Sequence, residues 1–85
     1  MAVPAVRYGE PAPRVEQALR AEFPADTIKL SEGYRGRVHV LIVSQRLDGL
    51  SERAKQDLVW DVLRRDLGPD AADVALVIAY GTDEL

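Results

Sequence analysis

The sequence contains no cysteine. This absence excludes a disulfide-stabilised scaffold, a zinc site built from thiolates, a cysteine-ligated iron–sulfur cluster and a cysteine nucleophile. Histidine is almost as scarce, because His39 is the only one in 85 residues. A single imidazole lacks the companion groups that metal or nucleophilic catalysis needs. The sequence therefore predicts a protein that is not an enzyme and that holds no metal ion or other cofactor of its own.

Long apolar runs are also missing from the start of the chain. Residues 1–9 include Pro4 and have no apolar stretch of the length that a signal peptide or a membrane span requires. We therefore expect a cytoplasmic protein that does not associate with membranes. With 47% hydrophobic residues in a chain of 85, there is enough apolar material for one packed core but not for two ordinary domains.

Acidic residues outnumber basic ones, for a net charge of −3, but the two signs are unevenly distributed. Residues 31–47 carry three arginines against one glutamate, whereas residues 48–85 carry nine acidic and four basic side chains. Nucleic-acid binding without sequence specificity depends mainly on the density of cations that face the phosphates. The acidic second half therefore argues against a general nucleic-acid-binding surface.

Hydrophobic spacing predicts a helix and a hairpin in the first half of the chain. The proline-rich residues 1–12 are expected to form a flexible arm. From Pro13, apolar residues at helical spacing predict a short amphipathic helix that ends before Pro24. Residues 27–31 alternate polar and apolar side chains, and residues 37–44 are apolar on both faces. We expect these two segments to be the strands of a hairpin, with the second strand central in the sheet.

The second half contains the signals of a longer helix and a final strand. Ser51 suits an N-cap, a broad apolar stripe runs to Leu67, and Gly68-Pro69 is typical of a helix C-terminus. Residues 74–80 form a short apolar run typical of a strand, and the connecting helix favours parallel pairing with the preceding strand. We predict one α+β domain over residues 13–85, in the order helix-strand-strand-helix-strand, with a three-stranded mixed sheet and both helices on one face.

Several short segments carry a family resemblance: Gly49-Leu50-Ser51 after a strand that ends in Ile42-Val43-Ser44, then Leu58-Val59-Trp60, and Ala79-Tyr80 followed by Glu84. From Val15 to Leu85 the chain resembles the BolA-like family, small cytoplasmic proteins with a class II KH-like fold. The resemblance implies an adaptor that binds a monothiol glutaredoxin, shares a [2Fe-2S] cluster with it in iron–sulfur trafficking and takes part in stress responses. In some members it implies DNA binding as a transcriptional regulator.

The positions of that family's cluster ligands hold other residues here. The resemblance places Asp73 at the histidine that opens the third strand, and Tyr34 to Arg37 at the hairpin loop that offers a second Cys or His. Lys55-Gln56-Asp57 stands at a run usually written Arg-His-Arg. A carboxylate is a harder ligand than the imidazole or thiolate that cluster iron favours. We therefore predict docking to a glutaredoxin without ligation of its cluster.

The hairpin tip is the predicted contact surface. Gly33-Tyr34-Arg35-Gly36 matches the G-x-x-G pattern of KH domains, but it lies at a hairpin tip, where glycines serve to turn the chain. Tyr34 can stack on a base, and Arg35 and Arg37 can meet phosphates. The candidate partner-binding residues are Tyr34, Arg35, Arg37 and Asp73. The first three are also the candidate nucleic-acid contacts, which leaves a nucleic-acid-binding transcriptional regulator as the alternative function.

Two other features have structural explanations. His39 lies two residues after Arg37 on the same strand, so we expect its side chain on the solvent-facing side of the sheet. Asp57 and Asp61 stand four residues apart on the second predicted helix, with arginines at helical spacing around them. Exposed ion pairs explain these carboxylates better than acid–base catalysis does.

Overall fold

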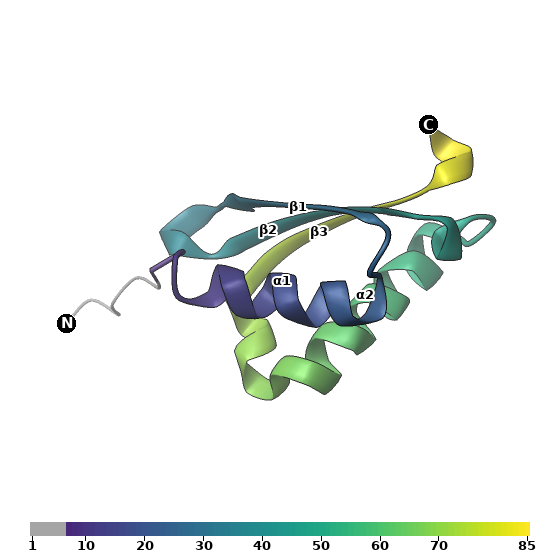
Figure 1. Cartoon of the computed structure of the whole chain (residues 1–85). Coiled ribbons are helices and arrows are strands. Elements are labelled where there is room, and N and C mark those ends of the chain that lie inside the picture. Colours follow the sequence, from purple (N-terminus) through teal and green to yellow (C-terminus); the bar gives the residue numbers. More distant parts are fainter. Residues whose placement is uncertain (1–6) are drawn as a thin grey trace.

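The computed structural model describes residues 7–85 and shows two α-helices packed on one face of a three-stranded sheet (Figure 1). The helices are α1 (Pro11–Glu22) and α2 (Glu52–Leu67), and the strands are β1 (Thr27–Glu32), β2 (Val38–Ser44) and β3 (Val74–Gly81). Short 3₁₀ segments follow or join them: η1 (Tyr34–Gly36), η2 (Gln45–Leu47), η3 (Gly68–Asp73) and η4 (Thr82–Glu84). The predicted α+β class and order of elements are confirmed. Within residues 7–85, no helix combines the length and apolar character needed to cross a bilayer.

β2 is the central strand, as its two apolar faces predicted. β1 pairs with it in the antiparallel direction and β3 in the parallel direction, so the sheet is mixed. Because β2 and β3 run the same way, Val38 and Val74 lie side by side at the end of the sheet that carries the hairpin tip. The hairpin tip and the start of β3 therefore share one end of the sheet, and η2 and η4 share the other (Figure 1).

Local signals set both ends of α2. Ser51 Oγ accepts a hydrogen bond from the backbone N–H of Ala54 at 3.1 Å, as an N-cap does. At the other end Gly68 adopts φ 57°, a left-handed value that favours glycine, and its N–H donates to the carbonyl of Arg64. Pro69 cannot continue the helix. The chain therefore leaves α2 at the predicted position and turns toward β3.

The first helix begins earlier than the sequence predicted. Pro11 and Ala12, which were assigned to a flexible arm, belong to α1 and are buried. A proline is tolerated in a first helical turn because the N–H that it lacks would have no partner there. The helix consequently starts at Pro11 rather than at Pro13. Residues 1–6 of the predicted arm lie outside the described residues.

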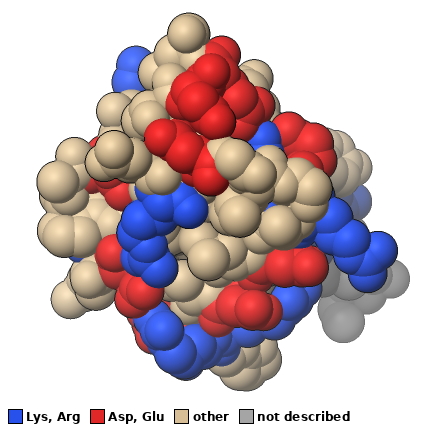
Figure 2. All heavy atoms as spheres, turned by 90° about the vertical axis from the view of Figure 1, so that its right-hand side faces the viewer, with Lys and Arg blue, Asp and Glu red and all other residues tan. Residues whose placement is uncertain are grey.

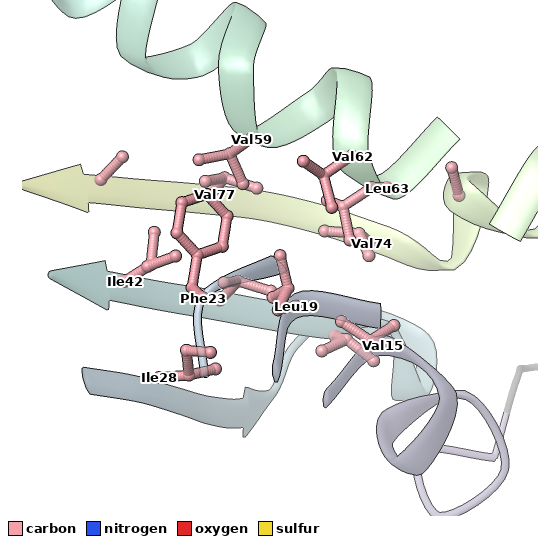
Figure 3. Close-up of a cluster of buried hydrophobic side chains, with 14 of the residues drawn as sticks. Val15, Leu19, Phe23, Ile28, Ile42, Val59, Val62, Leu63, Val74 and Val77 are labelled. Atoms are coloured by element: carbon pink, nitrogen blue, oxygen red, sulfur yellow. The ribbon is translucent and has the colours of Figure 1, made fainter. Parts of the chain in front are cut away.

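The hydrophobic core fills the space between the sheet and the helices (Figure 3). Phe23 enters it from the end of α1 and is 1% exposed. Other fully buried side chains of this core come from both helices, β2 and η2, and include Leu19, Val38, Ile42, Leu47, Val59 and Leu63. All of this burial lies on the side of the sheet that the two helices cover, and no helix within residues 7–85 lies on the other side (Figure 1).

Truncation of Phe23 tests this arrangement. We expect Phe23→Ala to lower the free energy of unfolding by about 3 to 5 kcal/mol, because the change removes a buried ring and leaves a cavity. Chemical denaturation followed by circular dichroism measures the loss. Leu50→Ala, at a side chain that is 38% exposed, is the control and should change stability by less than about 1 kcal/mol. Equal losses in the two variants would contradict the burial of Phe23.

Candidate functional site

The hairpin tip presents the predicted contact residues on a defined turn. The N–H of Gly33 donates to the carbonyl of Arg37 at 2.7 Å, and the N–H of Arg37 donates to the carbonyl of Tyr34 at 3.2 Å. Between them Arg35 adopts a left-handed backbone, with φ 58° and ψ 33°. These two backbone hydrogen bonds close the loop and determine the direction in which its side chains leave it.

An exposed aromatic ring with cations beside it forms the surface of this tip. Tyr34 is 77% exposed, and the guanidinium carbon of Arg35 lies 5.4 Å from the centroid of its ring. This distance is within the range of a cation–π contact. Arg37 is also exposed. Tyrosine and arginine are the residue types that recur at the energetic centres of protein interfaces, so the tip has the composition of a binding surface.

His39 lies beside the tip and has a packing role. Its side chain is on the face of the sheet away from the helices, as predicted, and is half-buried. A Cβ atom at Gly33 would collide with the imidazole, because the ring occupies the space where that atom would be. The close approach of His39 therefore explains the glycine at position 33 without any catalytic role for the imidazole.

Asp73 is at the same end of the sheet as the tip, but its carboxylate pairs with a side chain of α1. It precedes Val74, the neighbour of Val38 on β2. Its carboxylate lies 3.5 Å from the guanidinium of Arg14 on α1, which also pairs with Asp70 at 2.7 Å. The structure thus brings the four candidate residues to one end of the molecule without joining them into one cluster. Tyr34, Arg35 and Arg37 form the tip, whereas Asp73 helps to attach α1 to η3.

A buried lysine at the opposite end was not predicted as a site residue. Lys55 is 1% exposed, and its Nζ lies 2.6 Å from carboxylate oxygens of both Glu52 and Glu84. Glu84 also accepts a hydrogen bond from the N–H of Gly81 at 2.9 Å. Lys55 stands four residues before the buried Val59 on α2. This helical spacing places it on the same face of the helix, and it could have indicated from the sequence that Lys55 is buried. The three charged groups hold η4 against the first turn of α2.

Asp48 adds a second attachment for the C-terminal turn. Its carboxylate accepts a hydrogen bond from the hydroxyl of Thr82 at 2.7 Å. The neighbouring N–H of Gly49 donates to the carboxylate of Asp83 at 3.0 Å. The hydroxyl of Thr82 is the main cause of a lowered pKa at Asp48. The loop between β2 and α2 and the turn after β3 are therefore joined by hydrogen bonds to ionised carboxylates.

Several other charged side chains form ion pairs on the surface. Glu22, at the end of α1, pairs with Arg46 at 3.2 Å and with Arg65 at 3.1 Å. These three side chains line a shallow groove of about 440 Å³, in which one carboxylate stands between two guanidinium groups. Asp57 and Asp61 each lie near an arginine on the exposed side of α2, as predicted. Within residues 7–85, no group of three or more acidic or histidine side chains is placed to hold a metal ion.

Comparison with protein-family models, curated proteins and solved structures finds no match to this chain.

The pH dependence of stability should report on the C-terminal turn. The pKa of Glu84 is lowered from 4.5, mainly by the hydrogen bond from Lys55 and then by that from Gly81. The pKa of Asp48 is lowered from 3.8. A carboxyl group with a lowered pKa in the folded state stabilises that state above its unfolded pKa, and this contribution is lost as the pH falls through the folded pKa. We therefore expect the thermal midpoint to fall as the pH drops below about 4.5.

Glu84→Gln isolates the contribution of the ion pair with Lys55. The variant should have a lower thermal midpoint than the wild type at pH 7, and the difference should shrink toward pH 3, because protonation of Glu84 in the folded state removes the ion pair. Differential scanning calorimetry at pH 7, 5 and 3 measures it. Glu16→Gln, at an exposed position on α1, removes the same charge and should leave the midpoint close to that of the wild type. A difference that persists unchanged at pH 3 would show that Glu84 does not act through its charge.

Proposed function

We propose that this chain is a small non-catalytic adaptor that binds a protein partner through its hairpin tip, and that the partner is a monothiol glutaredoxin, as the BolA-like resemblance implies. The observation that carries the proposal is the exposure of Tyr34, 77%, on a turn closed by two backbone hydrogen bonds. A side chain presented on an ordered turn loses little conformational entropy on binding, so more of its contact energy appears as affinity.

The ion pairs near the tip support docking without cluster ligation. Asp73, at the position of the family's ligand histidine, lies within ion-pair distance of Arg14. A carboxylate that already has a cationic partner is a poor competitor for an iron that favours softer ligands. The chain would therefore contribute a contact surface to the complex, and the glutaredoxin would keep its own set of cluster ligands.

A nucleic-acid-binding regulator is the second candidate, and the same tip favours it. An exposed tyrosine can stack on an unpaired base, and the cations of Arg35 and Arg37 can meet the backbone phosphates. Acidic side chains stand close by, since Glu32 pairs with Val38 at the end of the hairpin. The tip is small, and it has few cations compared with surfaces that bind nucleic acids tightly. A protein partner is therefore the better fit.

A titration followed by amide chemical shifts tests the proposal. Addition of a monothiol glutaredoxin loaded with its cluster should shift the signals of Tyr34 to Arg37, while the visible spectrum of the cluster stays unchanged. Tyr34→Ala should weaken binding at least about tenfold, since truncation of an interface tyrosine commonly costs more than 1 kcal/mol. Leu50→Ala, at the opposite end of the sheet, is the control and should bind like the wild type. Absence of shifts at the tip would reject the adaptor proposal.

The same experiment with short DNA and RNA separates the two candidates. Functional nucleic-acid binding should weaken steeply between about 50 and 200 mM salt, and the double variant Arg35→Ala, Arg37→Ala should abolish it. Shifts at Tyr34 to Arg37 with nucleic acid but not with glutaredoxin would favour the regulator.

A further inference from the structure

The sheet has an apolar face that no described element covers. β2 places His39 there, beside Leu76, and β2 and β3 together place five apolar side chains there: Leu41, Val43, Leu76, Ile78 and Tyr80. They lie in register, because Leu41 pairs with Ile78 and Val43 with Tyr80. The three on β3 are 43%, 41% and 40% exposed in chain order. We call these five residues the open face. A contiguous apolar patch of this kind on a small protein marks an interaction surface.

The polar side of the same sheet bounds this patch. β1 contributes Thr27, Lys29 and Ser31 to the uncovered side, and all three are exposed. Lys29 pairs with Leu41, so the cation stands beside the middle row of the open face. The apolar surface is therefore confined to β2 and β3.

The outer edge of β3 is closed to an added strand at its centre. The side-chain amide of Gln56 on α2 donates to the backbone carbonyl of Val77 at 2.8 Å. The indole N–H of Trp60 donates to the other end of that amide at 3.0 Å. A side chain that occupies an edge carbonyl blocks the ladder of hydrogen bonds that strand addition requires. A partner of this surface must therefore lie on the face of the sheet rather than along its edge.

Charges of opposite sign stand at the two ends of the open face. Arg37 precedes Leu41 by four residues, and its backbone is extended, with φ −68° and ψ 162°. The alternation of a strand places it on the same side as Leu41. Thr82 and Asp83 follow Ile78 by four and five residues, and η4 rises on the side of the sheet away from the helices (Figure 1).

The C-terminal end of the open face is strongly acidic. Glu52 and Glu84 both bond to the ammonium of Lys55, and Asp48 accepts a hydrogen bond from the N–H of Asp83 in the adjoining turn. Figure 2 shows acidic side chains grouped at the top of this end of the molecule. Arg37 is four strand residues, about 13 Å, from Leu41, and the acidic end begins just after Gly81, the last residue of β3 and the third after Ile78. A surface with a cation at one end and carboxylates at the other is complementary in charge to its own copy turned by 180°.

We infer that the open face is the interface of a homodimer, in which two copies pack face to face with antiparallel strands and the Arg37 of each meets the Asp48 and Asp83 end of the other. The middle row of Leu41 and Ile78 lies on the two-fold axis. The same surface on both copies makes the contact, as a two-fold interface requires. Lys29 lies at the rim, where its ammonium stays in water.

The size of the face sets the expected affinity. Two strands spaced by about 4.8 Å, each rising about 3.3 Å per residue, give the open face and its charged ends a footprint of roughly 10 by 25 Å. This is smaller than the about 800 Å² per partner of a standard specific interface. The dimer should therefore be reversible, with a dissociation constant on the order of 10 to 100 µM.

Sedimentation equilibrium of the full chain between about 5 µM and 1 mM tests the dimer. The wild type should pass from monomer to dimer over this range. Ile78→Lys should stay monomeric throughout, because it places two ammonium groups at the centre of the interface. Leu50→Lys is the matched control, since Leu50 is 38% exposed and Ile78 41%, and it should dimerise like the wild type. A wild type that is monomeric at 1 mM, or an equal loss in both variants, would overturn the inference.

Charge exchange tests the antiparallel arrangement. Arg37→Glu and Asp83→Arg should each raise the dissociation constant at least about tenfold. The double variant should return it to within about threefold of the wild type, because the pair of opposite charges is restored with its signs reversed. In 1 M salt the difference between Arg37→Glu and the wild type should disappear, since charges are screened within about 3 Å. Weakening in both single variants without recovery in the double variant would reject the antiparallel arrangement.

A folding control and a partner control keep the result separate from the proposed function. Asp83 bonds to the N–H of Gly49, so the thermal midpoint of Asp83→Arg must be shown to match that of Asp83→Asn. Tyr34 lies outside the open face, so Tyr34→Ala should dimerise like the wild type. Ile78→Lys should still give amide shifts at the tip with a glutaredoxin if that proposal holds. Different variants therefore test the two interactions: Ile78→Lys tests dimerisation, and Tyr34→Ala tests binding at the tip.

Discussion

One constraint underlies the rest of the structure: a sheet covered by helices on a single side has only one core, and its central strand must supply the middle of that core. Val38, Val40 and Ile42 of β2 do this, each at most 1% exposed. Because β2 pairs with both other strands, its position also determines where the hairpin tip and the start of β3 lie. The exposed tip and the uncovered face of the sheet both follow from building one core on a single side of the sheet.

The polar contacts at the two ends of the sheet mainly determine where the chain's last elements lie. They contribute less to the stability of the fold. Exposed ion pairs such as Arg14 with Asp70 contribute little free energy. Lys55 is different, because burial of its ammonium costs solvation that the two carboxylates offset. An apolar side chain could fill the same space, but it could not hold Glu84. The ion pairs therefore place η4, and with it the acidic end of the open face.

Most of the fold could be predicted from the sequence because its signals are local. Ser51 and Gly68 define the ends of α2 through contacts within one turn, and β2 is central because it is apolar on both faces. The predicted start of α1 at Pro13 was wrong. Proline usually interrupts a helix, but Pro11 lies in the first helical turn, where a proline is compatible with the helix. Nothing local could reveal that Asp73 pairs with Arg14 or that Lys55 pairs with Glu84, because these partners are far apart along the chain. The tip was predicted as a contact surface, but its shape comes from backbone hydrogen bonds that composition does not specify.

The contrast between β1 and β3 is the strongest reason to regard the open face as functional. On the uncovered side, β1 carries Thr27, Lys29 and Ser31, which are all exposed, so this chain places polar residues at these positions. β3 carries Leu76, Ile78 and Tyr80 in the same environment. The core does not require these three, since Val74, Val77 and Ala79 supply the buried side of the strand. Gln56 meanwhile occupies a backbone carbonyl at the edge of β3, which hinders the pairing of another strand with that edge. A sequence that protects the edge of a strand and leaves its face apolar is adapted to a contact made by that face.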